Sequence, residues 1–95
     1  MENQHRKITG YRELDQTEID LMNKIKALGP IIEDMIEEVK IHLINQHTQA
    51  ATALDHSVED RMRDATPERF VSIAKTDFQT ALMCLTRAVA QPTFF

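Results

Sequence analysis

Aromatic and basic side chains lie close together near the start of the chain, in the run His5–Leu14 (HRKITGYREL). This run holds the only tyrosine, Tyr11, and three of the eleven Lys and Arg residues, namely Arg6, Lys7 and Arg12. A π face can stack on a base, and guanidinium or ammonium groups can bind phosphate. Gly10 has no Cβ, which would let the backbone approach a ligand closely. The run therefore suits a ligand that is both aromatic and anionic, such as a nucleotide.

Two lysines follow in the next segment, Lys24 and Lys26. On a helix they flank opposite edges of the apolar face, and Lys26 lies where the rim of a pocket could form. Taken as residue types alone, a surface tyrosine and two solvated lysines whose stems cover the core are the more common arrangement.

A second polar constellation is expected on one face of a later helix, at spacings of three and four: Arg69, Ser72, Thr76, Thr80, Met83 and Arg87. Arg69 falls in the first turn, where free backbone N–H groups and the helix dipole favour an anion. A solvated face is again the more common reading of such a stripe.

The elements that would position these residues are helical. Asp15 followed by Glu18 is close to a capping box and predicts a short helix over residues 15–28. Gly29–Pro30 is expected to end or kink it, and a second helix follows over 30–52. Residues 54–65 stay open between a loop and a short helix. Thr66 as N-cap and Pro67 at the first helical position predict a third helix over 66–90, and 91–95 form a tail.

The predicted fold is therefore all-α, with a short N-terminal helix followed by a long antiparallel helical hairpin in one domain covering residues 1–95. Residues 1–14 are the predicted ligand-contacting segment. Ile41 lies opposite the main apolar stripe, and Phe94 and Phe95 have no local partner. Apolar groups that one thin hairpin cannot cover predict a symmetric homo-oligomer.

Charge and composition exclude several classes of function. The net charge of −4 disfavours DNA or RNA as a partner, since a basic field supplies most of that affinity. No run is long and apolar enough to span a membrane, and no leader opens the chain. The single cysteine, Cys84, excludes an internal disulfide, fits a reducing cytoplasm and is expected to be buried in apolar packing.

No motif predicts a metal, a cofactor or a reaction. Glu38 and His42 are four apart, but the predicted helix over residues 30–52 contains no Glu-x-x-His of the kind that helical di-iron sites use. There is no Gly-rich phosphate loop and no nucleophile with a recognisable base. We therefore expect a protein that is not an enzyme.

Four segments resemble a known family: the run around Tyr11, the stretch MNKIKALG at 22–29, and the C-terminal stretches AKTDFQT at 74–80 and LTRAVAQP at 85–92. Together they resemble the phage anti-CBASS cyclic-nucleotide sponges, small helical proteins that sequester the second messengers of bacterial antiviral signalling.

The resemblance implies a homohexamer that acts in the cytoplasm of the infected bacterial host. It implies that cyclic dinucleotides such as 3′,3′-cyclic GMP–AMP bind through stacking on Tyr11 and a phosphate contact from Lys26. Gly10 and Arg12 are expected to contact the same ligand. It also implies a separate pocket for cyclic trinucleotides at Arg69 and Thr76, where subunits meet around a threefold axis.

One alternative of another class stays open. A helical hairpin could also inhibit a host protein through helix-in-groove packing, and the apolar periodicity suits that role equally well. Replacing Tyr11 would distinguish the two hypotheses, because it would abolish nucleotide capture but barely disturb binding of a protein to a face of the hairpin.

Overall fold

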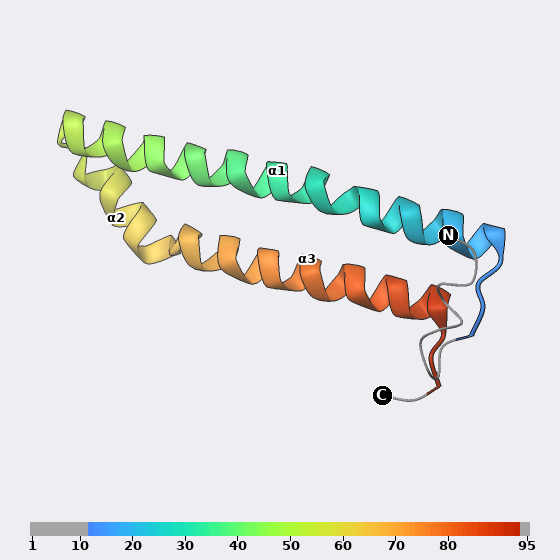
Figure 1. Cartoon of the computed structure of the whole chain (residues 1–95). Coiled ribbons are helices and arrows are strands. Elements are labelled where there is room, and N and C mark those ends of the chain that lie inside the picture. The colour runs from blue at the N-terminus through green and yellow to red at the C-terminus, as the bar shows by residue number, and fades with distance from the viewer. Residues whose placement is uncertain (1–11, 94–95) are drawn as a thin grey trace. The chain divides into compact units, whose positions relative to one another are not determined.

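The computed structural model describes residues 12–93 of the 95-residue chain, and this part is helical. The helices are α1 (Gln16–Ala53), α2 (His56–Ala65) and α3 (Pro67–Ala90), which follow one another along the chain as Figure 1 shows. Residues 12–93 contain no strand, which confirms the all-α prediction. No helix in this range is long and apolar enough to cross a membrane.

The chain divides into two compact units, which we call the terminal unit and the turn unit. Within the described range, the terminal unit combines residues 12–29 with residues 79–93, and the turn unit is Pro30–Phe78. The terminal unit pairs the first part of α1 with the last part of α3. The turn unit holds the rest of α1, all of α2 and the first part of α3. Each unit therefore pairs α1 with α3, in the hairpin-like arrangement that was predicted.

The predicted break at Gly29–Pro30 is wrong, because α1 runs without interruption from Gln16 to Ala53 with Pro30 inside it. Proline has no N–H to donate to the carbonyl of Lys26, and an interior proline costs a helix about 3 kcal/mol. Apolar residues keep one helical phase on both sides of the step, and Ile25, Ile32 and Ile36 are all half-buried. Packing of this continuous stripe offsets the local cost. The boundary between the two units still falls at this step.

The start of α1 confirms the predicted capping box. The N–H of Glu18 donates to Oδ1 of Asp15 at 2.8 Å, and the N–H of Asp15 donates to Oε1 of Glu18 at 2.9 Å. These reciprocal bonds satisfy backbone donors that the first helical turn leaves without partners.

Residues 54–65, left open by the sequence, form α2 over most of their length. Asp55 caps this helix by accepting from the N–H groups of Ser57 at 3.1 Å and Val58 at 3.3 Å. The hydroxyl of Ser57 also donates to Asp55 at 2.6 Å and, with the two N–H groups, lowers the pKa of that carboxyl. On its apolar side α2 places Met62 in the core, where only 5% of it is exposed.

Thr66 directly precedes α3, and its carbonyl accepts from the N–H of Arg69 at 3.1 Å as that of an N-cap does, but its backbone also ends α2. Its φ of 47° is left-handed, and its N–H donates to the carbonyl of Met62 at 3.0 Å, so it closes the C-terminus of α2. An N-cap residue normally has extended backbone. Pro67 is the first residue of α3, as predicted.

Replacing Thr66 with Gly is expected to raise the free energy of unfolding by about 1 kcal/mol. A β-branched residue pays a steric penalty at positive φ, whereas Gly adopts that backbone freely. Urea denaturation followed by circular dichroism measures the change. Ala65→Gly, one residue earlier and inside α2, is the matched control and should instead destabilise by about 0.5–1 kcal/mol. A loss of stability in Thr66→Gly would contradict the expectation.

Large apolar side chains are poorly covered in the single chain. Among the described residues, the buried hydrophobic core comprises Leu43, Ala50 and Met62. Many larger side chains stay exposed, including Ile41 at 57%. The rest of this exposed set is Leu21, Leu28, Ile31, Met35, Val39, Ile44, Leu54, Phe70, Ile73, Phe78, Met83 and Leu85. Phe94 and Phe95 lie outside the described residues.

Candidate functional site

The terminal unit contains a cavity of about 910 Å³ between the start of α1 and the end of α3. This volume lies within the range of small-molecule pockets, roughly 300–1,000 Å³. One wall comes from the segment before α1 and from α1 itself: Leu14, Ile19, Met22, Asn23, Ile25 and Lys26. The other comes from α3 and the residues after it: Thr80, Leu82, Met83, Cys84, Thr86, Arg87, Ala90 and Pro92.

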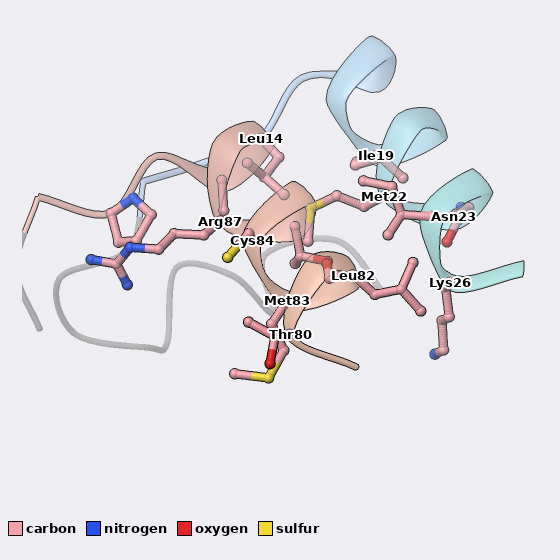
Figure 2. Close-up of a pocket in the computed structure, with 14 residues that line it drawn as sticks. Leu14, Ile19, Met22, Asn23, Lys26, Thr80, Leu82, Met83, Cys84 and Arg87 are labelled. Carbon is pink, nitrogen blue, oxygen red and sulfur yellow. The ribbon is translucent and has the colours of Figure 1, made fainter. Parts of the chain in front are cut away.

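The charge of this cavity is opposite to that of the chain. Lys26 and Arg87 are the charged residues among its described lining, which holds no carboxylate. The whole chain, by contrast, carries fifteen acidic residues against eleven basic ones. Figure 2 shows the two basic side chains at opposite ends of the cavity, with apolar side chains between them. A ligand with an apolar body and more than one negative charge complements this arrangement.

Polar groups near Lys26 are available for a ligand. Lys26 and Asn23 lie one helical turn apart on α1, and Thr80 lines the cavity from α3. Within the part of the chain that the structure describes, no hydrogen bond or ion pair occupies these three side chains. An ammonium, an amide and a hydroxyl therefore line one cavity with their donors uncommitted.

Sulfur-containing and aliphatic side chains form the body of the cavity. Met22 reaches in from α1, while Met83, Cys84 and Leu82 come from α3 (Figure 2). Cys84 is exposed, so the predicted burial of this thiol is wrong. Its apolar sequence neighbours indicated a packed position, but it lies on a cavity wall rather than inside the core.

Arg12 joins the beginning of α1 to the end of α3 at one end of the same unit. Its Nη1 donates to Oε1 of Glu18 at 3.0 Å, and its Nη2 donates to Oε2 of the same carboxylate. Its Nε also donates to the carbonyl of Ala90 at 3.1 Å, and Nη2 to that of Val89 at 2.8 Å. The remaining Nη1 contact reaches the carbonyl of Glu13 at 3.5 Å. A guanidinium has five N–H donors, and these contacts engage all of them.

The carbonyls of Val89 and Ala90 that Arg12 binds belong to the last turn of α3, where a helix leaves its acceptors without internal partners. Gln91, at φ 54°, satisfies another carbonyl of the last turn by donating its N–H to the carbonyl of Arg87 at 2.8 Å. A cation at this position also opposes the negative end of the helix dipole.

Glu18 holds this arrangement together electrostatically. The hydrogen bonds from Arg12 lower its pKa from 4.5 to about 2, with the backbone N–H of the Asp15 cap acting in the same direction. The same pair raises the pKa of Arg12. Since the folded-state value is depressed, the contribution of Glu18 to stability is present above pH 4.5 and is lost as the pH falls towards 2.

Comparison with known proteins decides the family. The model of the Acb2/Tad1 hairpin domain matches residues 3–90. The chain belongs to the Acb2/Tad1 hairpin family. It is similar to "Anti-CBASS protein 2" of Pseudomonas phage JBD67, with 42% identity over 105 aligned positions that cover 97% of each chain. The resemblance identified from the sequence is thereby confirmed.

In this Acb2/Tad1 hairpin, the structure locates only some of the residues predicted to bind ligands. Lys26 lines the cavity. Tyr11 and Gly10 lie outside the described residues. Arg12 is described, but it is absent from the cavity lining and has its donors engaged elsewhere.

The two residues predicted for a trinucleotide pocket lie in the turn unit, on the first half of α3. Arg69 and Thr76 are both exposed and seven residues apart, on the same face of the helix. The guanidinium carbon of Arg69 lies 5.2 Å from the centroid of the Phe70 ring, a cation–π contact.

The cavity also contains residues that sequence reasoning did not assign to a site. Asn23 lies three residues before Lys26, and Arg87 lies seven after Thr80, so each pair shares a helical face. The spacing of Thr80, Met83 and Arg87 was visible in the sequence. What it did not reveal is which part of α1 lies opposite them. The residues described here also contain no group of three or more His, Cys, Asp or Glu side chains able to hold a metal ion.

Proposed function

We propose that this chain is a phage anti-CBASS protein that captures cyclic dinucleotides without degrading them, in the cytoplasm of the infected bacterium. Membership of the Acb2/Tad1 hairpin family and the similarity to an anti-CBASS protein support the pathway. One observation supports the ligand class: an acidic chain forms an apolar cavity whose charged lining is basic. A cyclic dinucleotide combines flat bases with two phosphates and matches that chemistry.

Each proposed contact has a separate physical role. Lys26 neutralises one phosphate, and Arg87 supplies positive charge at the other end of the cavity. Tyr11 stacks on a base, and Gly10 lets the backbone come close to the ligand. Asn23 and Thr80 offer hydrogen bonds to a base edge or a sugar.

The proposed active form is a symmetric homo-oligomer, a hexamer by resemblance. Exposed apolar residues such as Ile31, Met35 and Ile41 are available to be covered by a second copy of the chain. Two copies related by a twofold axis would offer paired Lys26 residues to a ligand of approximate twofold symmetry.

We further propose a second site for cyclic trinucleotides at Arg69 and Thr76. Arg69 lies in the first turn of α3, where the helix dipole favours an anion, and its guanidinium can fork two donors to a phosphate. A threefold meeting of subunits would bring three copies of this pair around one ligand.

Capture, rather than cleavage, follows from the chemistry of the proposed dinucleotide site. Hydrolysis of a phosphodiester needs a base and groups that stabilise the charge of the pentavalent transition state. The described lining of the cavity contains no His, Asp or Glu.

Calorimetric titration with 3′,3′-cyclic GMP–AMP tests the proposal. We expect nanomolar affinity and about one ligand per two chains, since each site takes half of its contacts from each copy. Light scattering should give a mass several times 10.9 kDa. After heat denaturation, chromatography should recover the nucleotide intact. Absence of heat across a panel that includes a cyclic trinucleotide would overturn the proposal, and recovery of linear nucleotide would replace capture with hydrolysis.

The exposed apolar residues of α1 favour one alternative, a helical module that inhibits a host protein. Leu28, Ile31 and Met35 are all exposed and occur at spacings of three and four. Such a stripe fits a hydrophobic groove as well as it fits a second copy of the chain. A monomeric mass without nucleotide binding would favour this alternative.

A further inference from the structure

We infer that Arg12 contributes to ligand capture as a positioning residue, because it ties the start of α1 to the end of α3 and so fixes one end of the cavity. This inference rests on the proposed function for its effect on binding. It also replaces the direct ligand contact expected for Arg12 from the sequence.

The hydrogen bonds of Arg12 leave it little capacity for a phosphate. Its two terminal nitrogens donate to the carboxylate of Glu18. Nε donates to the carbonyl of Ala90 at 3.1 Å, and Nη2 donates to that of Val89 at 2.8 Å. A new contact to a ligand would have to break one of these bonds. The ion pair with Glu18 also cancels the charge of Arg12 locally, which lowers its attraction for an anion.

The anchor points of Arg12 are next to residues of the cavity wall. Glu18 adjoins Ile19, and Leu14 lies two residues after Arg12 itself. Ala90, whose carbonyl accepts from Arg12, lines the cavity directly. A single side chain thus links the α1 side of the cavity to its α3 side.

This linkage matters because the two cationic residues lie on different helices. Lys26 is on α1 and Arg87 is in the last turn of α3, where Arg12 holds the carbonyls. Each copy supplies half of a site, and its Lys26 and Arg87 must keep a fixed spacing to act on one ligand together. Binding therefore depends on how firmly the two helices are held relative to each other. Loosening the helix ends would reduce affinity without removing any ligand contact.

Glu18→Gln separates positioning from contact. Glutamine can still complete the capping box, so the start of α1 is kept while the ion pair with Arg12 is lost. If Arg12 contacted phosphate, freeing it and removing a nearby negative charge would tighten binding. Under the positioning role, binding of 3′,3′-cyclic GMP–AMP should instead weaken about 3–10-fold.

Arg12→Gln should weaken binding about 10–50-fold, and the double variant should bind no more weakly than Arg12→Gln alone. Lys75→Gln, an exposed change of equal charge on α3, is the matched control and should bind like wild type. If Arg12→Gln does not fold, Arg12→Lys replaces it, with an intermediate loss expected because an ammonium has three donors and cannot pair with both carboxylate oxygens and both carbonyls. Unchanged or tighter binding by Glu18→Gln would overturn the inference.

Amide hydrogen exchange in the ligand-free protein gives a readout independent of the proposed function. Exchange at Gln91, whose N–H closes the last turn of α3, should be faster in Arg12→Gln and in Glu18→Gln than in wild type or Lys75→Gln. If wild type binds no nucleotide, the proposed function fails, and this exchange pattern still decides whether Arg12 holds the end of α3. Unchanged exchange would overturn the positioning role itself.

Discussion

Lys26→Ala is expected to weaken binding of 3′,3′-cyclic GMP–AMP by about 10–150-fold per site, the loss of one charged hydrogen bond of about 1.5–3 kcal/mol. When two copies supply one lysine each, the two losses multiply to about 100–20,000-fold, which takes a nanomolar affinity into the submicromolar to micromolar range. The effect should be confined to binding, because no described residue forms an ion pair with Lys26. Calorimetric titration and urea denaturation of the same preparation measure both quantities.

Lys24→Ala is the matched control for this change. Lys24 lies two residues away on α1, is exposed like Lys26 and carries the same charge, but it does not line the cavity. We expect its affinity to stay within a factor of about three of wild type, since an exposed charge outside the site is largely screened. Equal losses in the two variants would show that net charge governs binding, and would remove Lys26 from the site.

Met62→Ala is expected to lower the free energy of unfolding by about 2–4 kcal/mol. Met62 is 5% exposed and packs α2 into the turn unit, so its truncation removes buried apolar surface and leaves a cavity. In a 95-residue protein this is a large fraction of the total stability. Urea denaturation followed by circular dichroism measures the change.

Leu54→Ala, in the same turn unit, removes a side chain of similar size that is 75% exposed. It should cost less than about 0.5 kcal/mol, as surface substitutions usually do. Nucleotide affinity should remain at the wild-type value in folded Met62→Ala, because Lys26 and Arg87 belong to the terminal unit. A smaller loss for Met62 than for Leu54 would refute the placement of α2 in the core.

Local signals in the sequence predicted local features well. The capping box of Asp15 and Glu18 needs only residues three apart, and Pro67 at the start of α3 needs only its own fixed φ. The continuation of α1 through Pro30 could not be predicted in this way. There the packing of the apolar stripe along α3 outweighs the helix-breaking effect of Pro30. The strength of that packing cannot be predicted from the residues next to the proline.

The candidate site was predictable only in part, for a related reason. Lys26 was identified by family resemblance, and the structure adds that it lines a cavity. Arg87 was seen on a polar face of its helix, but its position across from Lys26 depends on the register between α1 and α3. Arg12 was read from its charge alone, whereas its bonds to Val89 and Ala90 span more than seventy residues of sequence. Contacts of that range follow from the fold and not from spacing.

Under the proposed function, the scarcity of buried side chains among residues 12–93 has a consequence for the timing of infection. When assembly completes both the apolar packing and the ligand sites, the number of working sites rises more steeply than the number of chains, by mass action. Dilute early protein would then capture little messenger, and protection would begin once synthesis passes a threshold concentration. The concentration of the protein, as much as the affinity of each site, would set how soon host antiviral signalling is suppressed.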